Sequence, residues 1–96
     1  MPKGRKAELR DVAEGFALLS DPTRLGILSL LAKGPKNATA LCKAVGLTQP
    51  AFSYHLGLLR MGRLVNGVRQ GRSVVYATDK ANVKALASAL GKLTPK

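Results

Sequence analysis

Residues 37–62 of the chain read NATALCKAVGLTQPAFSYHLGLLRMG, and this stretch decides the fold. Asn37 predicts the start of a short helix over Ala38 to Val45, because an Asn side chain can cap the free N–H groups of a helix. Gly46 predicts its end, because glycine readily adopts the left-handed conformation that closes many helices. A second helix can begin two residues later, so the pattern indicates two helices joined by a short turn, Gly46-Leu47-Thr48.

The second helix is expected from Thr48, its N-cap, to Gly62. Its residues Phe52, Leu56 and Leu59 recur at steps of four and three, which places them on one buried face. A short helix, a turn and a helix that opens with small polar residues are typical of a helix-turn-helix, which lays its second helix in the DNA major groove. The outward positions are Gln49, Ala51, Ser53, Tyr54, Gly57 and Arg60.

Two helices are predicted before this unit. Apolar residues follow helical spacing from about Lys6 to Leu19 and indicate the first. Asp21 before Pro22 is the arrangement of an N-cap followed by a proline in the first helical turn. It predicts a second helix that reaches Lys33 and stops at Gly34-Pro35.

A hairpin and a last helix are predicted after it. The β-prone runs Leu64 to Val68 and Ser73 to Thr78 are joined by Arg69-Gln70-Gly71-Arg72, whose glycine suits a tight turn. Thr78 or Asp79 can cap a fifth helix with apolar residues at helical spacing. The expected fold class is mainly α with a small β-hairpin: a winged helix-turn-helix of five helices, with an antiparallel wing before the last.

The length and composition of the chain fit one domain. Its 96 residues are 46% hydrophobic and 22% charged, near the globular average. We expect a single domain over residues 1–96, with flexible ends at 1–5 and 94–96. No apolar run approaches the roughly 20 residues that cross a bilayer, so we expect no membrane partner and a cytoplasmic location. The single cysteine, Cys42, excludes an intramolecular disulfide.

The charge of the chain is strongly basic and unevenly distributed. Lys and Arg number 16 against 5 Asp and Glu, a formal net charge of +11. No acidic residue occurs from Pro22 to Thr78, a stretch that holds 8 basic residues. A polyanionic partner, double-stranded DNA first, is indicated, because a carboxylate on the binding face would repel phosphate. The alternative is a solvated surface that only keeps the protein soluble.

The candidate DNA-binding residues lie on the second helix of the helix-turn-helix, at the N-caps of both of its helices, and in the hairpin. Gln can pair with adenine in a bidentate manner, Ser can contact bases or phosphate, and an Ala methyl can meet the thymine methyl. Arginines at the hairpin tip can bind backbone phosphates. The full set is Asn37, Thr48, Gln49, Ala51, Ser53, Tyr54, Arg60, Arg69, Gln70 and Arg72.

Three motifs resemble the ArsR/SmtB family of bacterial and archaeal repressors. They are Leu19-Ser20-Asp21-Pro22-Thr23-Arg24-Leu25, the segment from Leu41 to Leu56 with its Ser53-Tyr54-His55-Leu56 box, and the segment from Leu58 to Val65. The resemblance covers roughly residues 9 to 93. It implies a homodimeric winged-helix repressor whose first and last helices form the dimer interface. The apolar stripes of these helices supply the expected interface residues Leu9, Val12, Phe16, Val83, Leu86, Ala87 and Leu90.

The resemblance also implies two metal sites, and the sequence departs from both. The site of the third helix uses a Cys-x-Cys pair near the segment that here reads Lys36-Asn37-Ala38-Thr39-Ala40-Leu41, while Cys42 lies about one turn too late. The site of the last helix uses Asp, His and Glu, which residues 80–90 lack, the nearest carboxylate being that of Asp79. We therefore expect no metal and no cofactor, and no motif identifies a small-molecule effector.

Catalysis is not expected, because the acid-free central region cannot supply a nucleophile, a base and an orienting acid. Cys42 is expected to be a buried filler, with a reactive thiol as the alternative. His55 is expected to be structural or to contact phosphate. The sequence thus favours a sequence-specific, homodimeric regulator that represses from an inverted-repeat operator. The alternative is a nonspecific architectural DNA-binding protein, which the net charge alone would support.

Overall fold

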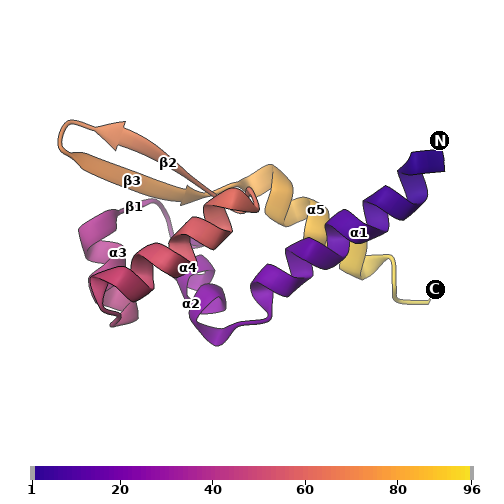
Figure 1. The fold of residues 1–96 in the computed structure, drawn as a ribbon, viewed down its shortest axis with the longest axis horizontal. Coiled ribbons are helices and arrows are strands. Elements are labelled where there is room, and N and C mark those ends of the chain that lie inside the picture. Colours follow the sequence, from indigo (N-terminus) through magenta and orange to yellow (C-terminus); the bar gives the residue numbers. More distant parts are fainter. Residues whose placement is uncertain (1, 96) are drawn as a thin grey trace.

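A computed structural model describes the backbone of residues 2–95 and the side chains of residues 8–95. Its described part confirms the winged helix-turn-helix, with α3 and α4 as the two helices of that motif and the β2–β3 hairpin as the wing before α5 (Figure 1). In chain order the elements are α1 (Pro2–Leu19), α2 (Pro22–Leu31), β1 (Lys36–Asn37), α3 (Ala38–Val45), α4 (Gln49–Met61), β2 (Val65–Gln70), β3 (Ser73–Thr78) and α5 (Lys80–Gly91).

The sheet contains a third strand that the sequence analysis did not predict. In β1, Lys36 lies opposite Tyr76 and Asn37 opposite Val75, so the strand order is β1-β3-β2 with antiparallel neighbours. Two residues are too few to show the alternation of a strand, and their partners lie far along the chain. The added strand attaches the start of α3 to the base of the wing.

The described helices differ slightly from their expected limits. α1 begins at Pro2 rather than near Lys6, so residues 2–5 belong to a helix that the apolar pattern did not extend to them. α2 ends at Leu31, before the expected Lys33. Of the ends that were expected to be flexible, Met1 and Lys96 lie outside the described residues.

The N-caps expected at Asp21, Asn37 and Thr48 are confirmed, and of the two candidates for α5 the cap is Asp79. The side chains of Asp21, Asn37, Thr48 and Asp79 each accept a hydrogen bond from the backbone N–H three residues later, at 3.0, 2.8, 3.4 and 3.2 Å respectively. Gly46 ends α3 with φ 70°, the left-handed conformation that favours glycine. These local interactions fix the start of each helix after α1.

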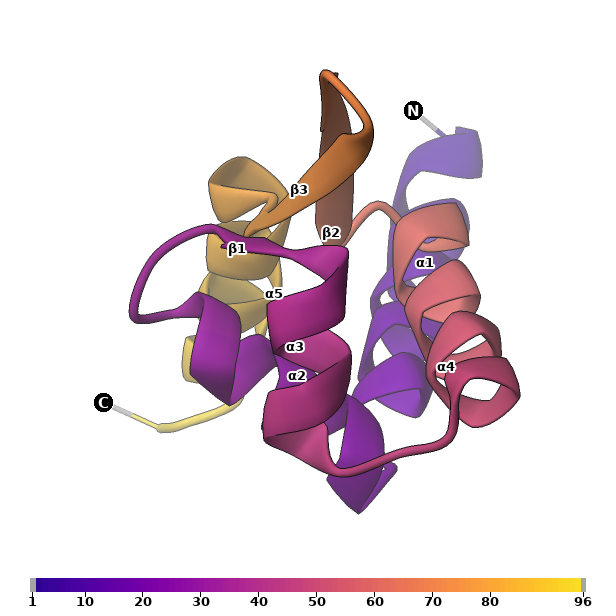
Figure 2. The same cartoon turned by 90° about the vertical axis from the view of Figure 1, so that its left-hand side faces the viewer.

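The core lies where α2, α3 and α4 meet the sheet. Ile27, Leu41 and Leu59, one from each of the three helices, are completely buried. Figure 2 shows the hairpin standing clear of the helices, so that its tip is free. The ten buried hydrophobic residues among those described are Ile27, Leu31, Leu41, Phe52, Leu56, Leu59, Leu64, Val65, Tyr76 and Leu86.

α1 and α5 pack together at the end of the molecule opposite the wing (Figure 1). Their contact is close at Gly15, where an added Cβ would lie 2.7 Å from Leu86 Cδ2. Leu86 is therefore covered by α1 of its own chain and is 8% exposed. The end formed by α1 and α5 contributes to the 45 Å long axis of the molecule.

Candidate nucleic-acid interface

The turn between α3 and α4 is held by backbone geometry and one sulfur contact. Gly46 N donates to the carbonyls of Cys42 and Lys43, both at 3.1 Å. Cys42 Sγ lies 3.5 Å from Leu47 O, in donor geometry, and its side chain is half-buried. Cys42 thus contacts the turn but is less buried than the filler that the sequence analysis expected, and it lines a small hollow with Leu47 and Phe52.

α4 has one buried and one exposed face. Phe52, Leu56 and Leu59 point into the core, as their spacing predicted. On the outer face Gln49, Ser53 and Tyr54 are exposed, Tyr54 to 63%. Ala51 is half-buried, which leaves less of its methyl group free for a contact with a base than the sequence analysis expected.

The caps Asn37 and Thr48 are exposed, but their side-chain oxygens are already engaged with backbone N–H groups. Asn37 keeps its amide NH₂ as a free donor, and Thr48 keeps its hydroxyl proton. Asn37 lies at the start of α3 and Thr48 at the start of α4, and each can donate to phosphate while capping its helix.

The wing carries an exposed basic tip. Gln70 pairs with Ser73, so Gly71 and Arg72 alone form the turn, and β2 extends further than the sequence predicted. Gly71 has φ 64°, a conformation that two-residue hairpin turns require and glycine adopts without strain. Arg69, Gln70 and Arg72 are all exposed.

Arg60 joins the exposed face of α4 to the wing. Its guanidinium carbon lies 5.7 Å from the ring centroid of Tyr76 on β3, within the range of a cation–π contact. Tyr76 is itself 8% exposed. The sequence analysis singled out Arg60 but missed Tyr76, because only a contact between distant segments reveals its role in placing this arginine.

A polar network anchors α4 to the start of α2. Arg24 Nε donates to Leu18 O at 2.6 Å, and Arg24 Nη1 lies 3.2 Å from His55 Nδ1. Because a guanidinium can only donate, this contact requires Nδ1 to be the unprotonated ring nitrogen. Asp21 Oδ2 lies 3.9 Å from the same nitrogen. His55 is thus placed as a structural histidine of α4.

The N-cap carboxylate of this network has a lowered pKa. The main cause is the hydrogen bond that Asp21 accepts from Arg24 N. Desolvation, the next largest effect, raises the pKa, and the positive charge of Arg24 lowers it further. The ionised form of Asp21 is therefore favoured in the folded chain.

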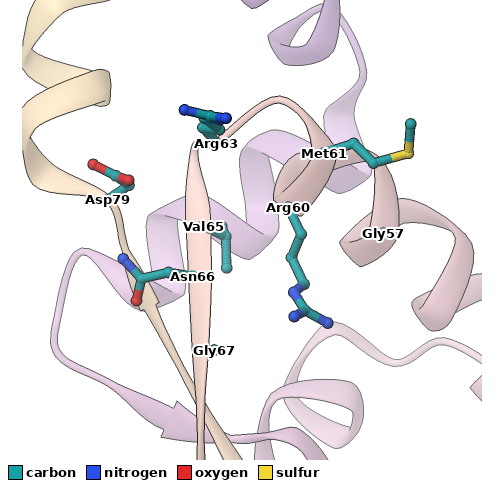
Figure 3. Close-up of a pocket in the computed structure, with 8 residues that line it drawn as sticks. All are labelled: Gly57, Arg60, Met61, Arg63, Val65, Asn66, Gly67 and Asp79. Carbon is teal, nitrogen blue, oxygen red and sulfur yellow. The ribbon is translucent and has the colours of Figure 1, made fainter.

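An open hollow of about 570 Å³ separates α4 from β2 (Figure 3). Arg60 and Met61 line it from α4, Arg63 lies in the junction before β2, and Asp79 lies on the far side. The sequence analysis counted Arg63 among the basic residues but did not place it at the candidate interface.

Comparisons with known proteins agree with this geometry. Residues 21–66 match the family described as bacterial regulatory protein, arsR family. One similar structure is the solution NMR structure of the homodimeric winged helix-turn-helix DNA-binding domain of a possible ArsR-family transcriptional regulator from Mycobacterium bovis. Its sequence is 32% identical to this chain, and the TM-score is 0.75. The match covers 93% of this chain and 86% of that chain. The chain belongs to the ArsR family.

Two curated ArsR-family relatives are regulators by name. The HTH-type transcriptional regulator NmtR of Mycobacterium tuberculosis is 43% identical over 75 residues, which cover 78% of this chain and 62% of that protein. The transcriptional repressor SmtB homolog of Synechocystis is 37% identical over 79 residues, covering 82% of this chain and 60% of that protein. This chain therefore spans about three fifths of their length. The family consists of transcriptional regulators rather than enzymes.

The residues expected to form the ArsR-type dimer interface differ in how exposed their side chains are in the single chain. Leu9 on α1 and Leu90 on α5 are 61% and 58% exposed. Ala87 is exposed as well. Val12, Phe16 and Val83 are half-buried against the core, and Leu86 is buried within the single chain. The apolar stripes thus serve partly as the chain's own core.

Potential metal ligands are scattered in this ArsR-family chain. Cys42 contacts Leu47 O, His55 contacts Arg24, and Asp79 caps α5. Within the described residues, no group of three or more His, Cys, Asp or Glu side chains is arranged to hold a metal ion. No helix in that part of the chain is long and apolar enough to span a membrane.

Proposed function

We propose that this chain is a sequence-specific, homodimeric regulator that binds double-stranded DNA and represses transcription from an inverted-repeat operator. The observation that carries the proposal is the exposed face of α4, where Gln49, Ser53 and Tyr54 lie beside a basic wing. A helix with this face fits the major groove, while the tip of the wing reaches the adjacent backbone or minor groove.

The chemistry of the two elements supports different roles. Gln49 and Ser53 are short enough to reach base edges from the first turns of α4, and their donors and acceptors can distinguish base pairs. Arg69 and Arg72 on the wing favour phosphate, which carries no sequence information. We assign specificity to α4 and sequence-independent affinity to the wing, with Asn37, Thr48, Arg60 and Gln70 as additional backbone contacts.

A dimer explains the apolar surface at the far end of the molecule. Leu9, Leu90 and Leu93 are all more than half exposed, and a monomer would leave their hydrocarbon in water. A two-fold dimer through α1 and α5 would bury them and present two α4 helices to successive major grooves, which requires a two-fold DNA site. Repression then needs only that the dimer occupy a promoter, so we propose a cytoplasmic protein without catalytic chemistry, metal or cofactor.

The net charge of +11 favours a second candidate function, nonspecific coating of DNA. Selection of bound sequences from random duplex DNA by the purified protein separates the two. A regulator should enrich a two-fold motif with half-sites about 10 base pairs apart. Enrichment of no motif, with tight binding to all duplexes, would favour the coating function.

A further inference from the structure

The junction between α4 and β2 has an unusual backbone. Arg63 N donates to Arg60 O and Leu64 N donates to Leu59 O, both at 3.0 Å. This pair of bonds is a Schellman motif, in which the first residue beyond the cap adopts the left-handed conformation and is usually glycine. Here that residue is Arg63, with φ 62°.

Arg63 is the one non-glycine residue with positive φ in the described chain. A long side chain in this conformation costs conformational energy, and such outliers persist where other interactions fix them and concentrate at functional sites. Asn82 Nδ2 donates to Arg63 O at 2.8 Å, which holds the peptide in place from α5. Gly62 stands one position too early to relieve the strain and packs against Leu18 instead.

Among the described residues, the guanidinium of Arg63 forms no hydrogen bond or ion pair that would account for an arginine at this position. Its side chain is exposed, and among the described side chains the only contact within ion-pair distance joins His55 and Asp21. Asp11 and Glu14 of α1 line a second hollow beside Arg63 without forming such a pair. The guanidinium is therefore available to a ligand.

Arg63 and Arg60 both line the hollow between α4 and β2, and the Arg60 side chain extends along β2 away from Arg63 (Figure 3). If α4 lies in a major groove and the wing enters the next minor groove, the sugar-phosphate strand that separates the two grooves must pass between these elements. The hollow lies between these two elements, and the ring of Tyr76 holds the guanidinium of Arg60 beside it. The Asp79 carboxylate also lines the hollow, on the far side of β2 from Arg60, and accepts a hydrogen bond from Asn82 N as the cap of α5, so the phosphate is expected on the Arg60 side.

We propose that the hollow between α4 and β2 is a backbone-phosphate site of double-stranded DNA, and that Arg63 and Arg60, at its two ends, bind phosphates of the same strand. The inference rests on the proposed DNA-binding function and adds a residue and a site to it. It accounts for an arginine at a position where glycine would be less strained.

Three variants separate charge from backbone strain. Arg63→Gly removes the charge and the backbone strain. Arg63→Asn removes the charge and tolerates positive φ, whereas Arg63→Lys keeps the charge and the strain. We expect the Gly and Asn variants to melt at a higher temperature and to bind operator and random duplexes about three- to tenfold more weakly at low salt. The slope of log affinity against log salt should fall by about one for each subunit. The Lys variant should stay within about twofold of the parent in affinity.

The measurements are thermal unfolding of each protein and fluorescence anisotropy of labelled duplexes across a salt series. Arg63→Gly with parental affinity and salt slope would overturn the inference while leaving the DNA-binding function intact. A lower melting temperature of Arg63→Gly would also overturn it, because it would mean that Arg63 stabilises the fold, for example through α1. A parent protein that binds no duplex would overturn the proposed function and the phosphate site together.

Discussion

Arg24 Nη1 lies 3.2 Å from His55 Nδ1, and this contact joins the first turn of α2 to the middle of α4. The same guanidinium donates through Nε to Leu18 O at 2.6 Å, at the end of α1. One partly buried side chain therefore links three helices. The helix that is proposed to enter the DNA is positioned by an arginine that lies on another element.

Arg24→Ala should destabilise the fold by about 1–2 kcal/mol, because it removes two charge-assisted hydrogen bonds in a partly exposed site. For a domain of this size the melting temperature should fall by at least about 4 °C. Thermal unfolding followed by circular dichroism at equal protein concentration measures the change. Lys33→Ala, which removes an exposed positive charge in the turn after α2, is the matched control and should leave the melting temperature nearly unchanged. Equal shifts in the two variants would mean that the Arg24 contacts contribute nothing.

The Asp21 cap predicts an acid-sensitive part of the stability. Its pKa is lowered below the ordinary 3.8 by the hydrogen bond from Arg24 N. The folded state thus favours the ionised carboxylate, and this contribution is complete above pH 3.8 and disappears as the pH falls through the folded pKa. Asp21→Asn retains a capping oxygen but does not titrate. The difference in melting temperature between parent and variant should be constant near neutral pH and should shrink below pH 3.8. A difference that grows on acidification would contradict the assignment.

The parts of the fold that depend on local signals were predictable. The four N-caps and the end of α3 at Gly46 follow from interactions within three or four residues, so the sequence alone contains them. β1 and the burial of Tyr76 depend on pairing between distant segments, which no short pattern specifies. Leu86 shows a third kind of limit. Helical spacing predicts that the residue is buried, but it does not tell whether the same chain or a second subunit buries it. Here α1 of the same chain contributes much of the burial.

The candidate site was predictable in outline for the same reason. The outer face of α4 follows from subtracting its apolar stripe, whereas the hollow at Arg63 does not. Gly62 marks the end of α4 in the sequence, but the left-handed residue is the next one. Only the backbone conformation reveals that an arginine occupies the position that favours glycine.

The proposed dimer should depend on Leu9 and Leu90 rather than on Leu86. Both are more than half exposed in one chain, and each buried leucine contributes about 1.5–3 kcal/mol. The double variant Leu9→Glu, Leu90→Glu should sediment as a folded monomer at concentrations where the parent is a dimer. Leu25→Glu changes a leucine on α2 that is 48% exposed and serves as the control. A double variant that remains dimeric would place the interface elsewhere.

If α4 provides sequence specificity and the wing provides sequence-independent affinity, substitutions in the two elements should have different effects. Gln49→Ala should change the preferred base at one position of each half-site, with a loss of about 1–3 kcal/mol there. Arg72→Ala should weaken specific and random duplexes alike and reduce the salt slope by about one. Binding-site selection and salt-dependent anisotropy on both variants measure these effects. If both substitutions act equally on specific and random DNA, base recognition does not reside in α4.

DNA binding should be indifferent to transition metals and arsenite at stoichiometric concentrations. Zinc, nickel, cobalt or arsenite at the sites that the resemblance implies would need Cys42, His55 and Asp79, which lie on α3, α4 and at the start of α5. Each of the three already has another partner. Metal ligands must converge to about 2.0–2.3 Å from one ion, and side chains on three separate elements are not arranged to do so. Titrating each ion into the protein on labelled operator, with and without chelator, tests this. Cys42→Ser should bind DNA like the parent. Release of the operator at one or two equivalents of metal per dimer, abolished in Cys42→Ser, would instead make Cys42 a sensing ligand.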